Sequence, residues 1–183
     1  MVALTVLVAV VVKTFVAQVF WIPSASMVPQ LEVGDRVVVS KLAFRLHPPH
    51  RGDIVVFDAP GSRPPDRSSS PARVARTVLR ALGLSAESTE EYIKRVVALP
   101  GERVEGRAGR VYVDGRLLVE PYLPRGERTG DFAPVLVGPG QLFVMGDNRG
   151  NSADSRAFGP VRRSTVVGRA IVRMWPPSRA AFL

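Results

Sequence analysis

Two serine hydroxyls, two residues apart, lie in a short segment between prolines near the start of the chain. The segment reads Pro23-Ser24-Ala25-Ser26-Met27-Val28-Pro29. A serine becomes a nucleophile when a neighbouring base takes its proton. If Ser26 attacks a carbonyl group, its own N–H can face the developing oxyanion, and the Ser24 hydroxyl can supply a second donor. Serines in turns are usually structural, so this spacing alone leaves both interpretations open.

A serine nucleophile needs a base, and the two histidines of the chain are poor candidates. They are His47 and His50, separated by two prolines that favour an extended turn. A Ser-His-Asp triad needs its histidine on a rigid element. The chain contains no cysteine and offers no separate third ligand, so a zinc site at the histidines is not expected. We expect no metal and no cofactor.

The segment 91–102 offers a lysine as the base. If Tyr92–Leu99 is a strand, Lys94 shares one face with apolar neighbours at positions 92, 96 and 98. Burial lowers the pKa of a lysine, and a neutral amine can take a proton from serine, which arginine cannot do. The chain has lysine only at positions 13, 41 and 94. The alternative is a lysine that extends from a strand edge into solvent.

A third polar segment, residues 146–159, follows an apolar run and reads GDNRGNSADSRAFG. Dense polar residues between apolar strands usually form a long turn. Asp147, Arg149 and Asn151 have the spacing of a calcium loop. Such a loop, however, needs glycine where Ser152 stands and a bidentate glutamate where Phe158 stands. We therefore do not expect a calcium site here.

The elements that must position these residues are mostly strands. Short β-branched runs bounded by Gly and Pro predict strands at Arg36–Ser40, Ile54–Phe57, Tyr92–Leu99, Val111–Val113, Leu142–Met145 and Val166–Met174. Asp114-Gly115 predicts a type I′ turn in a hairpin over residues 111–118. Between the strands, Pro60–Pro71 reads as a linker and Ala72–Leu82 as a helix, so residues 60–90 form an insertion.

The N-terminus is apolar from Met1 to Val12, is interrupted by Lys13, and is largely apolar again to Ile22. Twelve helical residues rise roughly 18 Å, whereas a hydrocarbon core is roughly 30 Å thick. Either Lys13 extends to the interface and a helix continues towards Ile22, or the natural chain starts upstream. A cleaved export signal or a buried helix are the alternatives, although no basic stretch precedes the apolar run.

The net charge of +9 comes almost entirely from arginine. A basic surface can contact nucleic acid or anionic lipid headgroups. The sequence has no zinc-finger pattern, no long arginine-rich helix and no aromatic RNA-binding signature. We therefore expect no nucleic-acid partner, and a nucleic-acid-binding module stays only as an alternative that membrane fractionation would separate.

Taken together and in order, these segments resemble the bacterial type I signal peptidases. Residues 23–29 are similar to the nucleophile motif of that family, 34–39 and 51–57 to its next strands, 92–95 to its general-base motif and 146–156 to its last motif. The resemblance implies a mainly β catalytic domain with one or two short helices behind an N-terminal transmembrane or membrane-anchoring segment. We expect the anchor and an interfacial segment at 1–22 and the β domain at 23–183.

The resemblance also implies a role for each matching position. Ser26 would be the nucleophile and Lys94 the general base of a serine endopeptidase. Ser24 and the N–H of Ser26 would form the oxyanion hole. Ser152 would hydrogen-bond and orient Lys94, Asp154 and Arg156 would hold a salt-bridged scaffold behind the site, and Asp147 would support the same loop.

The implied substrates are exported preproteins, cut after small residues in an Ala-x-Ala pattern. Apolar residues around the dyad would shape the substrate pocket, with ordinary core packing as the alternative for each: Phe20, Ile22, Pro23, Met27, Leu31, Tyr92 and Ile93. The lipid bilayer would be a second partner, with Trp21 at the interface. We expect a single-pass protein of the cytoplasmic membrane with its catalytic domain on the extracytoplasmic face.

Two related functions stay open at this stage. Self-cleaving repressors of the DNA-damage response also use a Ser/Lys dyad in a related β fold, but they begin with a helix-turn-helix domain. A membrane-anchored homologue that binds signal peptides without cutting them would lack a working dyad. The apolar N-terminus argues against the first alternative, and the presence of Ser26 and Lys94 argues against the second.

Overall fold

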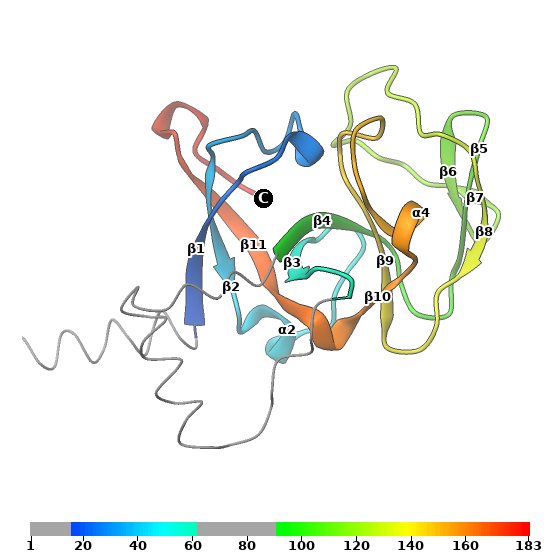
Figure 1. Ribbon diagram of the computed structural model, residues 1–183, viewed down its shortest axis with the longest axis horizontal. Helices are drawn as coiled ribbons and strands as arrows, with labels where there is room; N and C mark the ends of the chain where they lie inside the picture. The colour runs from blue at the N-terminus through cyan, green and yellow to red at the C-terminus, as the bar shows by residue number, and fades with distance from the viewer. Residues whose placement is uncertain (1–15, 62–90) are drawn as a thin grey trace, which may run out of the picture.

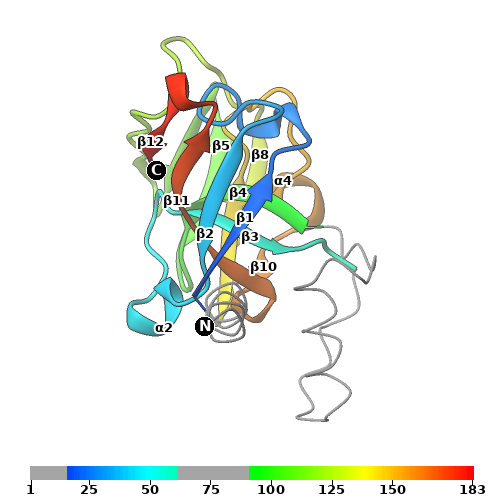
Figure 2. The same cartoon turned by 90° about the vertical axis from the view of Figure 1, so that its left-hand side faces the viewer.

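The computed structural model describes residues 16–61 and 91–183, which form two antiparallel sheets (Figure 1). The larger sheet has the order β1-β2-β11-β3-β4-β9-β10, and β12 pairs with β11. Its strands are β1 (Ala17–Trp21), β2 (Arg36–Ser40), β3 (Ile54–Asp58), β4 (Glu91–Ala98), β9 (Gln141–Met145), β10 (Val161–Arg162), β11 (Val166–Trp175) and β12 (Ala181–Phe182). Figure 2 shows β1, β2 and β11 crossing the face of the molecule side by side.

The smaller sheet has the order β7-β6-β5-β8 and lies on the opposite side from β1 in Figure 1. Its strands are β5 (Arg103–Arg107), β6 (Arg110–Val113), β7 (Arg116–Leu117) and β8 (Phe132–Leu136). The predicted hairpin is confirmed, because Val113 pairs with Arg116 across Asp114 and Gly115, which have φ angles of 49° and 73°. Two positive φ angles are what a type I′ turn requires.

Helical structure in the described part of the chain is short. It comprises α2 (Ala43–Leu46) and α4 (Ser155–Phe158), with 3-10 turns η2 (Ala25–Met27), η3 (Arg163–Thr165) and η4 (Pro177–Arg179). The mainly β fold with two short helices agrees with the prediction, but the helix predicted at Ala72–Leu82 lies outside the described residues.

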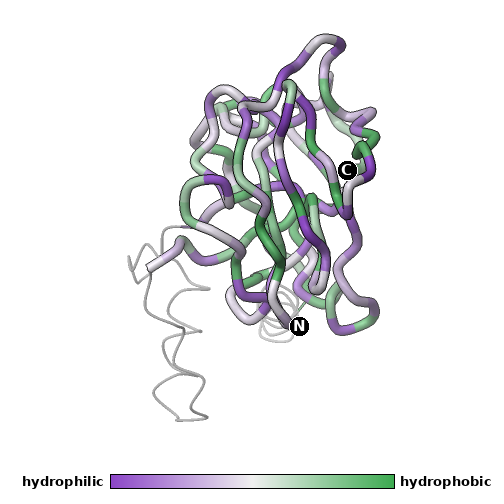
Figure 3. The backbone as a smooth tube through the Cα atoms, turned by 90° about the vertical axis from the view of Figure 1, so that its right-hand side faces the viewer, coloured by the Kyte–Doolittle hydropathy of each residue, from purple (hydrophilic) through white to green (hydrophobic). Residues whose placement is uncertain are grey.

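All six predicted strands are present within one or two residues of their expected ends. Several of them are continuous apolar runs, such as Ile54–Phe57 in β3 and Leu142–Met145 in β9, and their side chains are buried; Figure 3 shows green stretches along the backbone of this part of the molecule. Strands β1, β5, β8, β10 and β12 were not predicted, and in β8 the strand pattern is interrupted by Pro134. A proline is tolerated there because β8 lies at the edge of the smaller sheet and need not donate to a second neighbour.

The N-terminal part of the chain differs from one predicted alternative, a helix that continues towards Ile22. Ala17–Trp21 form strand β1, which pairs with β2 from Ala17↔Ser40 to Trp21↔Arg36, so no helix continues to Ile22. The expected boundary at residue 22 therefore falls at the end of the first strand of the sheet. Residues 1–15, which make up most of the segment 1–22 where the anchor was expected, lie outside the described residues. Among the described residues, no helix has both the length and the apolar character to cross a membrane.

Candidate active site

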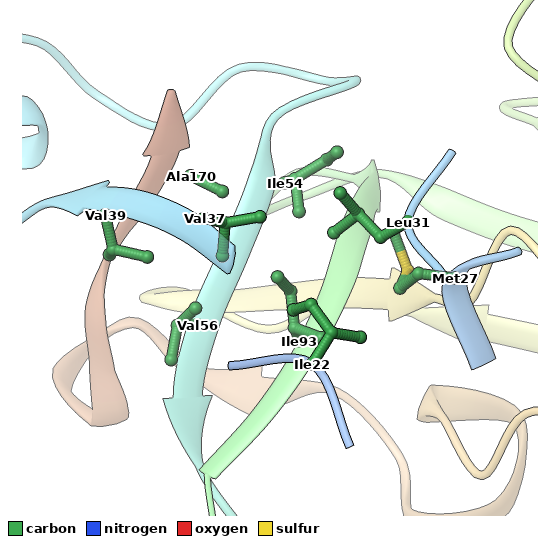
Figure 4. Close-up of a cluster of buried hydrophobic side chains, with 9 residues drawn as sticks. All are labelled: Ile22, Met27, Leu31, Val37, Val39, Ile54, Val56, Ile93 and Ala170. Atoms are coloured by element: carbon green, nitrogen blue, oxygen red, sulfur yellow. The ribbon is translucent and has the colours of Figure 1, made fainter. Parts of the chain in front are cut away.

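The turn that carries Ser26, the candidate nucleophile, is η2, which follows β1 and is fixed by the core beneath it. Ile22, Met27 and Leu31 are almost fully buried in one apolar cluster with residues of β2, β3, β4 and β11 (Figure 4). The backbone closes the turn, since Leu31 N–H donates to Met27 O at 2.8 Å and Ile22 N–H donates to Asp35 O at 2.9 Å. Apolar side chains on either side of Ser26 therefore place its hydroxyl.

Strand β4 brings Lys94 to Ser26 although the two are 68 residues apart. Lys94 Nζ donates to Ser26 Oγ at 2.8 Å and to Ile93 O at 2.9 Å. Both side chains are buried, with residue exposures of 4% for Lys94 and 8% for Ser26. A nucleophile and a base in this contact satisfy the geometric requirement for proton transfer.

The environment of Lys94 also adjusts its basicity. Burial lowers the pKa of Lys94 from 10.5 to about 8, against the charges of Asp154 and Asp147, which raise it. The Tyr92 ring centroid lies 5.5 Å from Nζ and covers one side of the amine. A lysine with a pKa near 8 is partly neutral at physiological pH, so it can accept the Ser26 proton.

Two donors suit an oxyanion beside Ser26. Ser24 is the N-terminal cap residue of η2, and its Oγ lies 3.2 Å from Ser26 Oγ. Ser26 N–H belongs to the first turn of η2, where backbone N–H groups have no acceptor within the helix. The donors expected from the sequence therefore lie together at the nucleophile.

Asp154 and Arg156 form a compact ion pair behind the dyad. The fully buried Asp154 carboxylate accepts from Arg156 Nε and Nη2, both at 2.8 Å, and from Gly146 N–H at 3.0 Å. Burial alone would raise the pKa of Asp154, but the bonds from Arg156 and Gly146 outweigh burial and lower this pKa. Asp154 also caps α4 through Arg156 N–H at 3.2 Å. The pair thus holds the loop after β9 to α4.

The Asp147 carboxylate is bound by Arg95, a residue of strand β4. Arg95 Nε and Nη2 donate to the two Asp147 carboxylate oxygens at 2.8 Å and 2.6 Å, and Arg95 Nη1 donates to Gly52 O at 2.8 Å. The carboxylate is completely buried. Lys94 and Arg95 therefore act on opposite faces of one strand, the first at Ser26 and the second at the loop 146–149.

Ser152 differs from its expected contact. Lys94 Nζ bonds Ile93 O in addition to Ser26, and the Ser152 hydroxyl makes no hydrogen bond of good geometry within the described residues. Ser152 still contributes to the low pKa of Asp154. Its hydroxyl packs against Gly146, where an added Cβ would lie 2.2 Å from Ser152 Oγ. The predicted Ser152–Lys94 bond is thus absent, and the two bonds of Lys94 Nζ go to Ser26 Oγ and Ile93 O.

The seven candidate pocket residues separate by burial. Met27 and Leu31 expose no surface, and Ile22 and Ile93 expose 1% and 7%, so all four belong to the core, the alternative kept for them above (Figure 4). The three candidates with accessible surface are Phe20, Pro23 and Tyr92. Phe20 packs against the same cluster, and Tyr92 packs with Phe57 and Phe158.

Several polar residues near the site were not predicted from the sequence. Arg149 has no exposed side-chain surface and pairs with Glu120, which precedes Tyr122 and Thr129 on one segment. Asn148 reaches the nucleophile turn, donating from N–H to Ser26 O and from Nδ2 to Ala25 O, each at 3.1 Å. Asn148 and Arg149 could have been suspected from the sequence, because they lie between Asp147 and Ser152. Nothing in the sequence around Glu120 indicated a role at the site.

Comparison with known proteins extends these observations. Residues 1–175 match the family described as "Signal peptidase, peptidase S26". The chain is 39% identical over 182 residues to a signal peptidase I from Leptolyngbya laminosa, covering 100% of this chain and 80% of the relative. It is 37% identical over 201 residues to a signal peptidase I from Mycobacterium tuberculosis, covering 92% and 68% respectively.

A solved structure is also similar. It is a signal peptidase I from Enterococcus faecalis, 30% identical, with a TM-score of 0.44, covering 66% of this chain and 95% of that one.

Proposed function

The chain belongs to the signal peptidase family, peptidase S26, a family of serine peptidases that remove signal peptides, and we propose that it does this chemistry with a Ser26/Lys94 dyad. The observation that carries the proposal is the 2.8 Å contact between Lys94 Nζ and Ser26 Oγ. Burial, which lowers the pKa of Lys94 to about 8, makes the amine a usable base in that contact.

Acylation of Ser26 is the first half of the proposed reaction. Neutral Lys94 takes the hydroxyl proton as Ser26 Oγ bonds to the scissile carbonyl carbon. The carbonyl oxygen becomes an oxyanion that accepts from Ser26 N–H and the Ser24 hydroxyl, and one such donor is typically worth about 3–4 kcal/mol. The carbon–nitrogen bond then breaks, and the Lys94 ammonium gives its proton to the leaving amine, which leaves an ester on Ser26.

Hydrolysis of the ester is the second half. Lys94 is neutral again, and it takes a proton from a water molecule that attacks the ester carbonyl. The same two donors stabilise the second oxyanion. When this intermediate collapses, the bond to Ser26 Oγ breaks and Lys94 returns the proton to the serine. Every proton transfer in the proposed reaction is therefore made by the Lys94 side chain.

The proposed substrates are exported preproteins cut after an Ala-x-Ala pattern. Ser26 and Lys94 expose only 8% and 4% of their surface, and we expect this burial to favour small substrate side chains beside them. Phe20, Pro23 and Tyr92 are the proposed substrate-facing residues, because they are the pocket candidates with accessible surface. We also place the catalytic domain on the extracytoplasmic face of the cytoplasmic membrane, with an anchor in the N-terminal residues and the bilayer as a partner.

The test is cleavage of a preprotein with an Ala-x-Ala site, in detergent, by the unmodified chain, Ser26→Ala and Lys94→Ala. We expect cleavage at that site by the unmodified chain and loss to background in both variants. Lys94→Arg is the matched control, because it keeps the charge but cannot be deprotonated, and it should also be inactive. Cleavage by Lys94→Ala at the normal rate would contradict the dyad.

A further inference from the structure

The segment between β7 and β8 extends from the smaller sheet and contacts the loop 146–149. Glu120 Oε1 accepts from Arg149 Nη2 at 2.5 Å, and Glu120 Oε2 accepts from Arg149 Nη1 at 3.2 Å. Thr129 Oγ1 accepts from Arg149 Nη1 at 2.9 Å. The arginine also donates from Nε to Gly146 O at 3.0 Å, so its guanidinium connects the segment to the first residue of the loop.

Tyr122 adds a second connection from the same segment. Its hydroxyl donates to Glu120 Oε1 at 2.8 Å, and its ring lies 4.0 Å beneath the Arg95 guanidinium. Arg95 in turn holds Asp147 through two hydrogen bonds. Burial and the neighbouring Glu120 charge raise the pKa of Tyr122, so its hydroxyl keeps its proton for this bond.

The other side of the loop contacts the nucleophile. Asn148 lies between Asp147 and Arg149 and donates twice to the backbone of the turn, to Ser26 O and to Ala25 O, each at 3.1 Å. A shift of the loop would therefore move Ser26 relative to Lys94. Displacements of about 1 Å at a reacting group can cost about 100-fold in rate.

The charges make Glu120 necessary to this arrangement. Arg149 has no exposed side-chain surface, and Glu120 is its only salt-bridge partner among the described residues. Removing one member of a buried pair leaves the other charge without compensation, which favours rearrangement of the loop. Glu120 itself touches neither member of the dyad, so its influence must pass through Arg149.

We propose that Glu120 and Tyr122 are positioning residues that hold Arg149 and Arg95 so that Asn148 keeps the Ser26 turn in contact with Lys94. The inference rests on the proposed Ser26/Lys94 function. It assigns a catalytic consequence to a segment outside the motifs of that family. The support comes from the connection between β7 and β8, which joins two strands of the smaller sheet.

The test uses the full chain and compares Glu120→Gln with the control Glu127→Gln, an exposed glutamate on the same segment. We expect Glu120→Gln to lower kcat about 10- to 100-fold with KM changed less than about threefold, because positioning and not substrate contact is lost. Glu120→Asp keeps the charge and should recover part of kcat. Glu127→Gln should behave as the unmodified chain. An unchanged kcat in a folded Glu120→Gln chain would overturn the proposal.

A double-mutant cycle separates positioning from general loss of structure. If Glu120 acts through the loop, adding Glu120→Gln to Asn148→Ala should lower kcat by less than about threefold further. If the loss of kcat in the double variant equals the product of the losses in the two single variants, the proposal is overturned. Should Glu120→Gln not fold, Thr129→Val removes one acceptor from Arg149 and keeps the ion pair. It should lower kcat about 3- to 10-fold in the unmodified background and not in Asn148→Ala.

Failure of this inference and failure of the dyad give different results. An inactive Lys94→Ala with a normal Glu120→Gln would overturn positioning alone. An active Lys94→Ala with a slow Glu120→Gln would overturn the dyad but keep the loop as the element that positions Ser26.

Discussion

Burial of the Lys94 amine lowers its pKa to about 8, and in the proposed mechanism this sets the pH at which the site works. Lys94 is surrounded by apolar strands and by the Tyr92 ring, while two carboxylates, Asp147 and Asp154, lie close enough to oppose the effect of burial. Each carboxylate is itself paired with an arginine. The pairing weakens their pull on the lysine, and burial therefore dominates its pKa.

The pH dependence of cleavage should follow Lys94. Because the proposed base is the neutral amine, kcat/KM should rise with pH through an apparent pKa of about 8 and level off above it. The measurement is a pH–rate profile on a preprotein under conditions where the chain stays folded. A profile that is flat from pH 6 to 9, or that rises only near the ordinary lysine value of 10.5, would contradict this role of burial.

Gly146 lies where two parts of the site approach most closely. A Cβ added there would come within 2.2 Å of Ser152 Oγ and 2.4 Å of Ser26 O. Since Ser26 O belongs to the nucleophile turn, Gly146→Ala should lower kcat by about 100-fold or more through displacement of that turn. Gly150→Ala is the matched control, because nothing lies within 4 Å of its added Cβ. Equal activities of the two variants would contradict the argument.

At the scale of elements, β4 is the strand on which the site depends. It pairs with β3 on one side and β9 on the other, and it carries Lys94 and Arg95 to opposite faces. The loop after β9 returns to the same place, because Arg95 holds Asp147 and Asp154 accepts from Gly146 N–H. Two adjacent strands and their connecting bonds thus fix the base relative to the loop.

The Asp154 carboxylate should stabilise the fold as well as the site. Asp154→Asn removes the charge from a fully buried group that pairs with Arg156, which should lower the free energy of unfolding by about 3–5 kcal/mol. Asp131→Asn, at an exposed position, is the control and should change it by less than about 0.5 kcal/mol. Urea unfolding monitored by fluorescence measures both.

The Asp154 carboxylate also predicts how the stability of the fold changes as the pH falls. Its pKa is lower in the folded chain than the ordinary value of 3.8. The stability that it contributes is therefore complete above pH 3.8 and is lost as pH falls through the lower folded value. The Asp154→Asn variant should lose less stability than the unmodified chain between pH 4 and pH 2. A parallel loss in both would contradict this assignment.

At the scale of the whole molecule, one face presents apolar rings beside a positive charge. Trp21 and Trp175 both pair with Arg36, from β1 and β11 respectively, and they expose 60% and 50% of their surface. The Arg36 guanidinium lies 5.9 Å from the Trp175 ring centroid. Tryptophan and arginine together suit the headgroup region of an anionic bilayer.

The proposed contact with the bilayer can be measured directly, because these are the two tryptophans of the chain. Anionic vesicles should shift the tryptophan emission to shorter wavelength, and brominated lipids should quench it. Trp21→Phe and Trp175→Phe report each position separately. Emission that does not change while the protein floats with the vesicles would show that another part of the chain makes the contact.

Local patterns were enough to predict the residue types of the proposed dyad, six of the strands and the Asp114-Gly115 hairpin. Each of these depends on a short-range signal: a β-branched run bounded by Gly and Pro, a turn that needs positive φ angles, or a motif of a few residues. The strand β8 and the strand conformation of Ala17–Trp21 were not predicted from the sequence. An edge position permits Pro134 in β8, and an apolar run suits a strand as well as a helix.

Several contacts that orient the site could be found only in the folded chain. The tertiary structure gave Lys94 the Ile93 carbonyl in place of Ser152, buried Met27 and Leu31 in the core, and joined Glu120 to Arg149 across 29 residues. Sheet order sets these contacts, and sheet order depends on packing over the whole chain. A local pattern can therefore name the nucleophile and the base, while only the assembled sheets fix the partners that orient them.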